Sequence, residues 1–268
     1  MTDTSAERVA ALVLAFAHGG NSAGEHSVSD LARAVGRERS QVSRMLKALE
    51  RGGLVEQNRG TKLYRLGWPL LVLASGAGNT PLLRAARPAL QSLVSRLGEV
   101  ALLSVQQGNR SLTVLREESH QSLRAGGWVG RSSPMHCSAS GRALLFDSDD
   151  ELVEALTSEA LLAPISTLAA PATFNELLTR LNAERAQGYS VASEEIEIGL
   201  TSVSAPVRDR NNEIVAVINV SGPTSRLISR VNDIAKLVLS AAAAVQQNLS
   251  SPTQSPIARQ RNSRAQLR

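Results

Sequence analysis

Aromatic residues are scarce in this chain of 268 residues, which has two Trp, two Tyr and three Phe. Proteins that hold single-stranded nucleic acid stack its bases on aromatic side chains, so this mode of binding is not expected. The single cysteine, Cys137, excludes an intrachain disulfide and fits a reducing compartment. No run of about 20 apolar residues is present to span a bilayer. The first residues lack the basic and apolar segments of a secretory signal. We therefore expect a cytoplasmic protein with no membrane contact.

Motifs of catalysis and metal binding are also missing. The sequence has no G-x-S-x-G or H-E-x-x-H pattern, which mark two classes of hydrolase. Its four histidines show no metal-ligand spacing. A hydrolase that uses Cys137 or Ser138 beside His136 is the enzymatic alternative, but neighbours in sequence rarely point at one another for proton transfer. We expect no enzyme activity, no metal site and no cofactor.

Positive charge is concentrated at the two ends of the chain. The net charge is +5. Residues 1–75 contain ten Lys or Arg against seven Asp or Glu, and residues 250–268 contain four Arg and no acid, which leaves the middle mildly acidic. This distribution favours a DNA-binding head joined to a domain with another task.

Residues 28–66 show the pattern of a winged helix-turn-helix. Apolar residues with helical spacing predict a short helix that ends at Gly36, where a left-handed backbone is expected. A second helix is predicted over residues 39–50, and the segments 54–56 and 63–66 predict a hairpin. Upstream, Val9, Leu12, Val13 and Phe16 form an apolar stripe that predicts one more helix.

The outer face of the second helix is polar and basic, which suits the major groove of duplex DNA. Arg, Gln and Ser can hydrogen-bond base edges there, whereas the basic residues of the turn and hairpin suit phosphates. The predicted DNA-binding residues are Arg37, Arg39, Ser40, Gln41, Ser43, Arg44, Lys47, Arg59 and Lys62. A merely solvated charged face is one alternative, and a ligand-binding module whose head contacts proteins is another.

A break rich in Gly and Ser at residues 75–79 divides the chain. We expect a winged helix-turn-helix domain with an apolar linker helix over residues 1–75, an effector-binding domain over 76–249 and a disordered basic tail over 250–268. The second domain is predicted to be α+β, a mostly antiparallel sheet with helices covering one side. Its predicted elements are a helix over 81–97, strands over 100–105, 112–115 and 122–129, a loop over 130–134, helices over 138–146, 148–157 and 174–187, strands over 189–193, 202–207 and 214–221, and a helix over 224–248.

Two longer motifs carry a family resemblance. Residues 130–145, GRSSPMHCSASGRALL, resemble the G-R-x-x-P-L-H-x-x-A-x-G-K-A-L-L signature of the IclR family of bacterial transcription regulators. A second run, G-Y-S-V with two glutamates, then G-L, A-P-V and V-S-G-P over residues 188–223, resembles that family's G-Y-x-x-D-D-E-E…G-L…A-P-V…S-G-P pattern. Together with the head, the resemblance covers residues 5 to 248.

The resemblance implies a GAF-like effector-binding domain, and dimers or tetramers that bind palindromic operators. It also implies that the effector is a small organic or aromatic acid or a related catabolite. We expect the protein to be a repressor of a catabolic operon. The acid's carboxylate would meet the start of the helix after the proline loop, an anion-binding position. The expected effector-binding residues are Ala139, Ser140, Leu200, Ser202, Asn219 and Ser221, with Trp128 and Met135 as apolar walls.

This sequence departs from the family pattern at one point in the pocket. The two acids that precede the paired glutamates in many relatives are replaced by Ala192 and Ser193. The loss of these charges favours a less polar effector, such as an aromatic acid or an amide. The choice between repressor and activator, the operator sequence and the effector itself are not encoded in any motif.

Overall fold

The computed structural model describes residues 4–17, 19–21, 24–76, 80–121, 129–161 and 167–250. Most of the predicted strand over 122–129, with Trp128, and nearly all of the predicted tail lie outside these ranges. The chain divides into two compact units, Met1–Thr80 and Pro81–Arg268. Within the described ranges, no helix combines the length and hydropathy that a membrane crossing requires.

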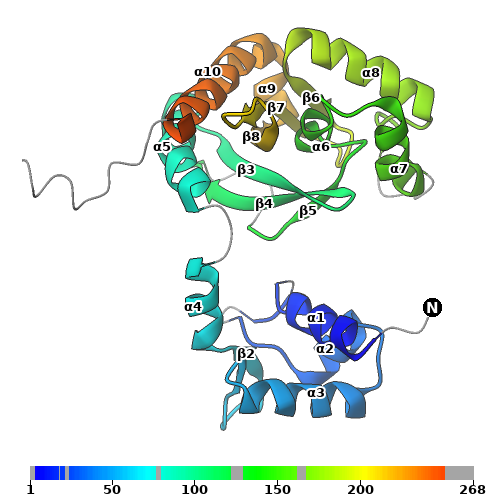
Figure 1. The fold of residues 1–268 in the computed structure, drawn as a ribbon, viewed down its shortest axis with the longest axis vertical. Helices are drawn as coiled ribbons and strands as arrows, with labels where there is room; N and C mark the ends of the chain where they lie inside the picture. Colours follow the sequence, from blue (N-terminus) through cyan, green and yellow to red (C-terminus); the bar gives the residue numbers. More distant parts are fainter. Residues whose placement is uncertain are drawn as a thin grey trace, which may run out of the picture. The chain divides into compact units, whose positions relative to one another are not determined.

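The first unit is a winged helix-turn-helix (Figure 1). Its elements are α1 (Ser5–Ala15), α2 (Val28–Ala34), α3 (Arg39–Arg51), the antiparallel pair β1 (Val55–Gln57) and β2 (Tyr64–Leu66), and α4 (Trp68–Gly76). The hydroxyl of Ser27 caps α2 by accepting from the N–H of Asp30, at 3.1 Å. Gly36 follows α2 with φ +62°, the left-handed conformation predicted for it.

A small apolar core holds the three helices and the hairpin together. It consists of the buried residues Leu12, Phe16, Leu31, Ala32, Val42, Leu46, Leu49, Val55 and Tyr64. Val9, predicted to belong to the apolar stripe of α1, is instead 37% exposed. The core thus reaches only the C-terminal half of α1.

The second unit is a six-stranded antiparallel sheet with the strand order β5-β4-β3-β8-β7-β6. The strands are β3 (Val100–Gln107), β4 (Arg110–Glu117), β5 (Ser132–Pro134), β6 (Ser190–Ser193), β7 (Leu200–Arg208) and β8 (Ile214–Pro223). The helices are α5 (Thr80–Leu97), α6 (Ala139–Leu144), α7 (Asp150–Leu161), α8 (Phe174–Gln187), α9 (Thr224–Leu227) and α10 (Val231–Ser250), with a 3₁₀ turn at Ile228–Arg230.

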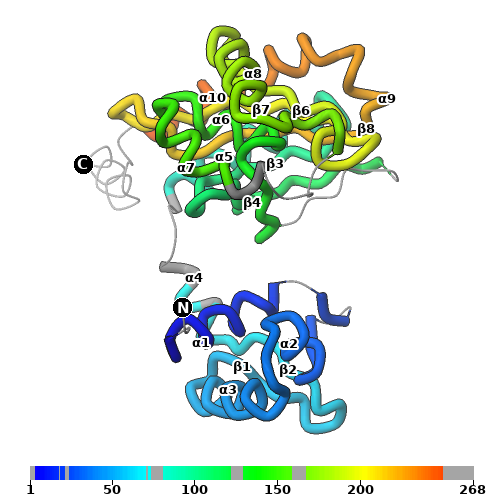
Figure 2. The backbone as a smooth tube through the Cα atoms, turned by 90° about the vertical axis from the view of Figure 1, so that its right-hand side faces the viewer, coloured from blue at the N-terminus to red at the C-terminus, as the bar shows by residue number. Residues whose placement is uncertain are grey.

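Helices cover both faces of this sheet, and not one face as the sequence suggested (Figures 1 and 2). Helices α5 and α10 pack on one face through a continuous apolar cluster. Helix α6 contacts the middle strands from the other face, and α7 and α8 lie beyond it. Because side chains alternate along a strand, β8 sends Ala216, Ile218 and Val220 into the α5–α10 cluster and turns Asn219 and Ser221 the other way.

Two further sequence expectations need correction. The segment predicted as a loop over 130–134 contains β5, which pairs with the start of β4 as an edge strand. The final helix, predicted as one piece, is broken by the 3₁₀ turn between α9 and α10.

Candidate functional site

The face of α3 that does not pack on the core is polar and basic. Val42, Leu46 and Leu49 fix the orientation of the helix because they are buried in the core. Of the predicted DNA-binding residues, Arg37 and Ser43 are half-buried, and the exposed ones are Arg39, Ser40, Gln41, Arg44, Lys47, Arg59 and Lys62. The structure therefore leaves most of these side chains accessible to a partner.

The hairpin tip is held by a single asparagine. The side-chain oxygen of Asn58 accepts from the N–H groups of Gly60 and Thr61, at 3.0 and 3.3 Å. Its backbone oxygen accepts from the N–H of Lys62, which has φ +59°. This local bonding is typical of Asn in turns. It gives the tip a fixed shape that presents Arg59 and Lys62 to solvent.

The second unit contains a cavity of about 40 Å³ between the sheet and the start of α6. Seven of the twelve residues that line it carry hydroxyl groups, and only three are aliphatic. The lining consists of Leu102, Ser104, Thr113, Arg131, Ser133, Ser138, Ser140, Ile196, Leu200, Ser202, Asn219 and Ser221. This set is defined here as the hydroxyl cavity.

Strand register explains why these hydroxyls gather. Asn219 and Ser221 of β8 lie opposite Ser204 and Ser202 of β7, all on the same face of the sheet. Asn219 donates through Nδ2 to the Ser221 hydroxyl and accepts through Oδ1 from the Ser204 hydroxyl, both at 3.0 Å. The amide of Asn219 is thus oriented by its neighbours, and Ser202, Asn219 and Ser221 of this row line the cavity.

The start of α6 closes the other side of the cavity. The hydroxyl of Ser138 donates to the carbonyl of Pro134 and accepts from the N–H of Gly141, which caps the helix. Gly141 has to be glycine, because a Cβ there would lie 2.5 Å from the Cα of Met135. The signature therefore encodes a tight connection between the edge strand and this helix.

The structure brings together five of the eight predicted effector-binding residues: Ser140, Leu200, Ser202, Asn219 and Ser221. Ala139 and Met135 are fully buried but do not line the cavity. Met135 packs instead in the apolar cluster of α6, α7 and α8, which also includes Val217 of β8. Trp128 lies outside the described residues.

Several lining residues were not singled out from the sequence. Ser104 and Thr113 belong to β3 and β4. The alternation of polar and apolar residues over 111–114 would have indicated Thr113, whereas Ser104 follows the unbroken apolar run 100–103, which gives no such signal. Arg131 and Ile196 come from connecting segments, where no periodicity marks the side that faces a cavity.

A buried ion network lies behind α6. Arg142, the residue at the lysine position of the signature, is fully buried. Its guanidinium donates to Glu184 at 2.9 and 3.0 Å and to Glu195 at 2.6 and 3.1 Å. It also donates to the carbonyls of His136 and Val191. All of its donor nitrogens are engaged, so its role is to join α6 to α8 and to the segment after β6.

Opposing effects act on the pKa of Glu195. Burial raises the pKa of Glu195, and the positive charges of Arg142 and Arg180 act against that rise. Arg180 lies 2.8 Å from Glu195 and is 38% exposed. Burial alone would lower the pKa of Arg142, but Glu184 and Glu195 hold it above its usual range.

The groups of the hydrolase alternative do not form an activated nucleophile. Burial raises the pKa of the Cys137 thiol to about 11, so the thiol is neutral at physiological pH. The hydroxyl of Ser138 is engaged in capping α6. Burial, with the nearby Arg142 and Arg110, lowers the pKa of His136. In the described part of the chain, no group of His, Cys, Asp and Glu is arranged to hold a metal ion.

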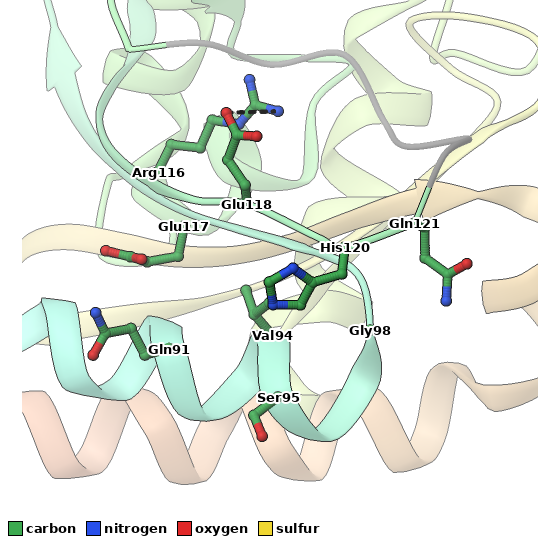
Figure 3. Close-up of a pocket in the computed structure, with 9 residues that line it drawn as sticks. All are labelled: Gln91, Val94, Ser95, Gly98, Arg116, Glu117, Glu118, His120 and Gln121. Atoms are coloured by element: carbon green, nitrogen blue, oxygen red, sulfur yellow. Dashed lines mark ion pairs between the residues drawn. The ribbon is translucent and has the colours of Figure 1, made fainter.

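A larger cavity, of about 610 Å³, lies between α5 and the end of β4 (Figure 3). It contains none of the predicted site residues. Its charged side chains are engaged with one another or with neighbours, since Arg116 lies 3.9 Å from Glu118 and Glu117 lies 2.7 Å from Arg87. Volume alone does not make it the stronger candidate, and the hydroxyl cavity has the more specific chemistry.

Comparison with known proteins decides the family. Residues 5–59 match the IclR helix-turn-helix domain, and residues 75–247 match the bacterial transcriptional regulator IclR C-terminal domain. The chain belongs to the IclR family. The HTH-type transcriptional repressor AllR of Salmonella paratyphi A is 30% identical to it over 210 residues, which cover 77% of this chain and 76% of that protein.

Solved structures of other IclR-type regulators share the fold. A transcriptional regulator from Rhodococcus sp. RHA1 has a TM-score of 0.72 and 26% identity, over 93% of this chain and 99% of that one. An IclR homologue from Microbacterium hydrocarbonoxydans, complexed with 4-hydroxybenzoate, has a TM-score of 0.75 and 23% identity, over 90% and 98%. The IclR-family assignment makes this chain a DNA-binding transcription regulator with an effector-binding domain.

Proposed function

We propose that this IclR-family protein is a ligand-controlled repressor of a catabolic operon. It binds a palindromic operator through α3 and the hairpin, and a small organic acid in the hydroxyl cavity. One observation carries the proposal: the same chain holds an exposed basic helix of a winged helix-turn-helix and a buried cavity lined by hydroxyl groups. The named AllR relatives are repressors, which supports the direction of control.

The DNA contacts divide by chemistry. Gln41 and Arg44 are exposed on α3 and have the side chains that read base edges in the major groove. Arg59 and Lys62 at the hairpin tip suit phosphates or the minor groove, where positive charge is favoured. The proposed DNA interface also includes the other predicted residues of the turn and of α3: Arg37, Arg39, Ser40, Ser43 and Lys47.

The chemistry of the cavity favours a polar acid. Hydroxyls and the Asn219 amide can donate to carboxylate oxygens, and Arg131 adds a positive charge to the lining. The sequence favoured a less polar effector, because Ala192 and Ser193 replace two acids of the family pattern. The polar lining of the cavity instead supports a polar effector. The ligand of the Microbacterium homologue, 4-hydroxybenzoate, is an acid as well.

Helix α4 supports assembly with a second copy of the chain. It contains no charged residue, and Trp68, Val72 and Leu73 are 71%, 71% and 62% exposed. An apolar helix with this exposure requires a partner surface in water. We assign that surface to another protomer, giving a homodimer or a homotetramer whose two heads meet the two halves of a palindrome.

The test is an unbiased selection of duplexes by the full-length protein. The proposal predicts enrichment of a palindromic site, and an affinity for that site that falls steeply between 50 and 200 mM salt through counterion release. Absence of any enriched duplex, or an affinity that does not change with salt, would favour a head that contacts proteins.

A further inference from the structure

One aliphatic side chain in the hydroxyl cavity does not come from the sheet. Leu102 and Leu200 belong to β3 and β7, whose positions are fixed by pairing with neighbouring strands. Ile196 belongs to residues 194–199, the connection between β6 and β7, which is called here the 194–199 turn. The size of the cavity at this wall is therefore set by a side chain of a turn, and not by one of the sheet.

The 194–199 turn is anchored on both sides of Ile196. Glu195 is buried and pairs with Arg142 and Arg180. The N–H of Thr167 donates to the carbonyl of Glu195 at 2.9 Å, and the N–H of Thr224 donates to the carbonyl of Gly199 at 2.8 Å. These contacts hold the wall of the cavity in one place.

The backbone of Glu194, at the start of the turn, is held in an unfavourable conformation by its hydrogen bonds. Glu194 has φ +58°, a conformation that residues with a side chain rarely adopt. Its N–H donates to the carbonyl of Leu200 at 2.7 Å, and its own carbonyl accepts from the hydroxyl of Thr167. A strained residue that the surroundings hold in place is common at ligand-binding sites.

The volume of the cavity is small for an effector. The cavity has a volume of about 40 Å³, whereas pockets for drug-sized ligands have volumes of ~300 Å³ or more. An aliphatic acid of a few carbon atoms is compatible with this space, and an aromatic ring is not unless a wall moves.

We infer that Ile196, held in place by the anchored 194–199 turn, sets the upper size limit of the acid that the hydroxyl cavity accepts. The inference rests on the proposed function and narrows its ligand class to small aliphatic acids. Removal of the Ile196 side chain beyond Cβ opens the wall toward solvent without touching the hydroxyls that meet the carboxylate.

The test compares two isoleucines of the same turn in the full-length protein. Ile196→Ala enlarges the cavity, and Ile198→Ala is the matched control because Ile198 is 79% exposed and does not line it. Dissociation constants for glycolate, lactate, benzoate and 4-hydroxybenzoate are measured by calorimetry. We expect the wild type and Ile198→Ala to prefer the two aliphatic acids by at least tenfold. Ile196→Ala should gain at least tenfold for the aromatic acids relative to the aliphatic ones.

Ile196→Val is included in case Ile196→Ala does not fold. It removes one methyl group and should shift the preference between aliphatic and aromatic acids in the same direction by a smaller factor. A preference order in Ile196→Ala and Ile196→Val identical to that of the wild type overturns the inference and leaves the proposed function intact. A wild type that prefers the aromatic acids also overturns it. If no protein of the set binds any of the four acids, the proposed ligand class fails, and the inference fails with it.

Discussion

Arg142 is a charged residue in a place where charge is unfavourable without partners. Its guanidinium is fully buried, and five of its contacts go to the carboxylates of Glu184 and Glu195 and to the Val191 carbonyl. Buried pairs of this kind contribute little net stability relative to apolar residues, but removal of one member leaves an uncompensated charge. Removal of Arg142 should therefore destabilise the protein by more than the intact ion network stabilises it.

Arg142→Met should lower the free energy of unfolding by about 3–5 kcal/mol, because Glu184 and Glu195 remain buried without their cation. Urea denaturation at pH 8 measures the loss. The control Arg142→Met/Glu184→Gln/Glu195→Gln removes the stranded charges and should recover part of the stability. A single variant as stable as the wild type would contradict the role given to the network.

The loss in Arg142→Met should also depend on pH. Burial already raises the pKa of Glu195 in the folded protein, and loss of Arg142 raises it further. A carboxyl with a raised folded pKa binds its proton more tightly in the folded state. The deficit is therefore smallest below the unfolded pKa, about 4.3, and grows as the pH rises through the folded pKa. Denaturation curves at pH 4 and pH 8 check the sign; a deficit that is larger at pH 4 contradicts it.

Cys137 should react slowly in the native protein. Burial raises the pKa of its thiol to about 11, and the side chain is inaccessible to reagents. Iodoacetamide at pH 8 should label the folded chain far more slowly than the chain in urea. Rapid labelling of the folded protein would revive the hydrolase alternative.

At individual positions, residues of the hydroxyl cavity could be predicted from the sequence where they lie on a strand or at the start of a helix. The family resemblance placed Ser202, Asn219 and Ser221 in one pocket, and alternation along a strand puts Asn219 and Ser221 on the same face. All three line the hydroxyl cavity. Met135 was assigned to the same pocket, but it belongs to a short connection without periodicity and packs in the apolar cluster with α6, α7 and α8. Ile196 lines the cavity through contacts distant in sequence, such as Glu195 with Arg142.

Among the elements, α3 and the hairpin carry different kinds of DNA contact. Arg44→Ala should cost roughly 1–3 kcal/mol of discrimination between the specific and a scrambled duplex, because a base-reading side chain is lost. Lys62→Ala should weaken binding to both duplexes by a similar factor, since phosphate contacts carry no sequence information. Competition assays with the two duplexes separate these effects, and equal losses in Arg44→Ala would remove it from the base-reading set.

Helix α4 should control the oligomeric state. Trp68→Glu/Leu73→Glu places two charges on its exposed apolar surface, which should shift the protein toward monomer. The matched control is Leu14→Glu, on α1, where Leu14 is 63% exposed. Sedimentation velocity measures the distribution. An unchanged distribution in the α4 variant would place the interface elsewhere.

Helices and strands could be predicted where residues close together in the sequence determine them. The two helices and hairpin of the head follow from spacing, turns and apolar faces, and α5, α7 and α8 also appear close to their predicted bounds. Strand β5 was missed because Ser and Pro favour a loop, and the pairing of residues 132–134 with residues 110–112 makes it an edge strand. The break after α9 likewise has no proline or glycine to mark it.

At the scale of the whole molecule, the chain joins two units with separate cores. Two binding sites on one chain are not sufficient for regulation. The binding of each ligand also has to change the affinity of the protein for the other ligand. This coupling is reciprocal: the factor by which an acid changes operator affinity equals the factor by which the operator changes acid affinity.

The most direct measurement titrates the selected operator with full-length protein, first alone and then saturated with the tightest-binding acid of the panel. We expect the acid to weaken operator binding by roughly 5–150-fold, the usual range of coupling between sites. The operator should weaken acid binding by the same factor in the reverse titration. An acid that saturates the hydroxyl cavity and leaves operator affinity unchanged would contradict the account.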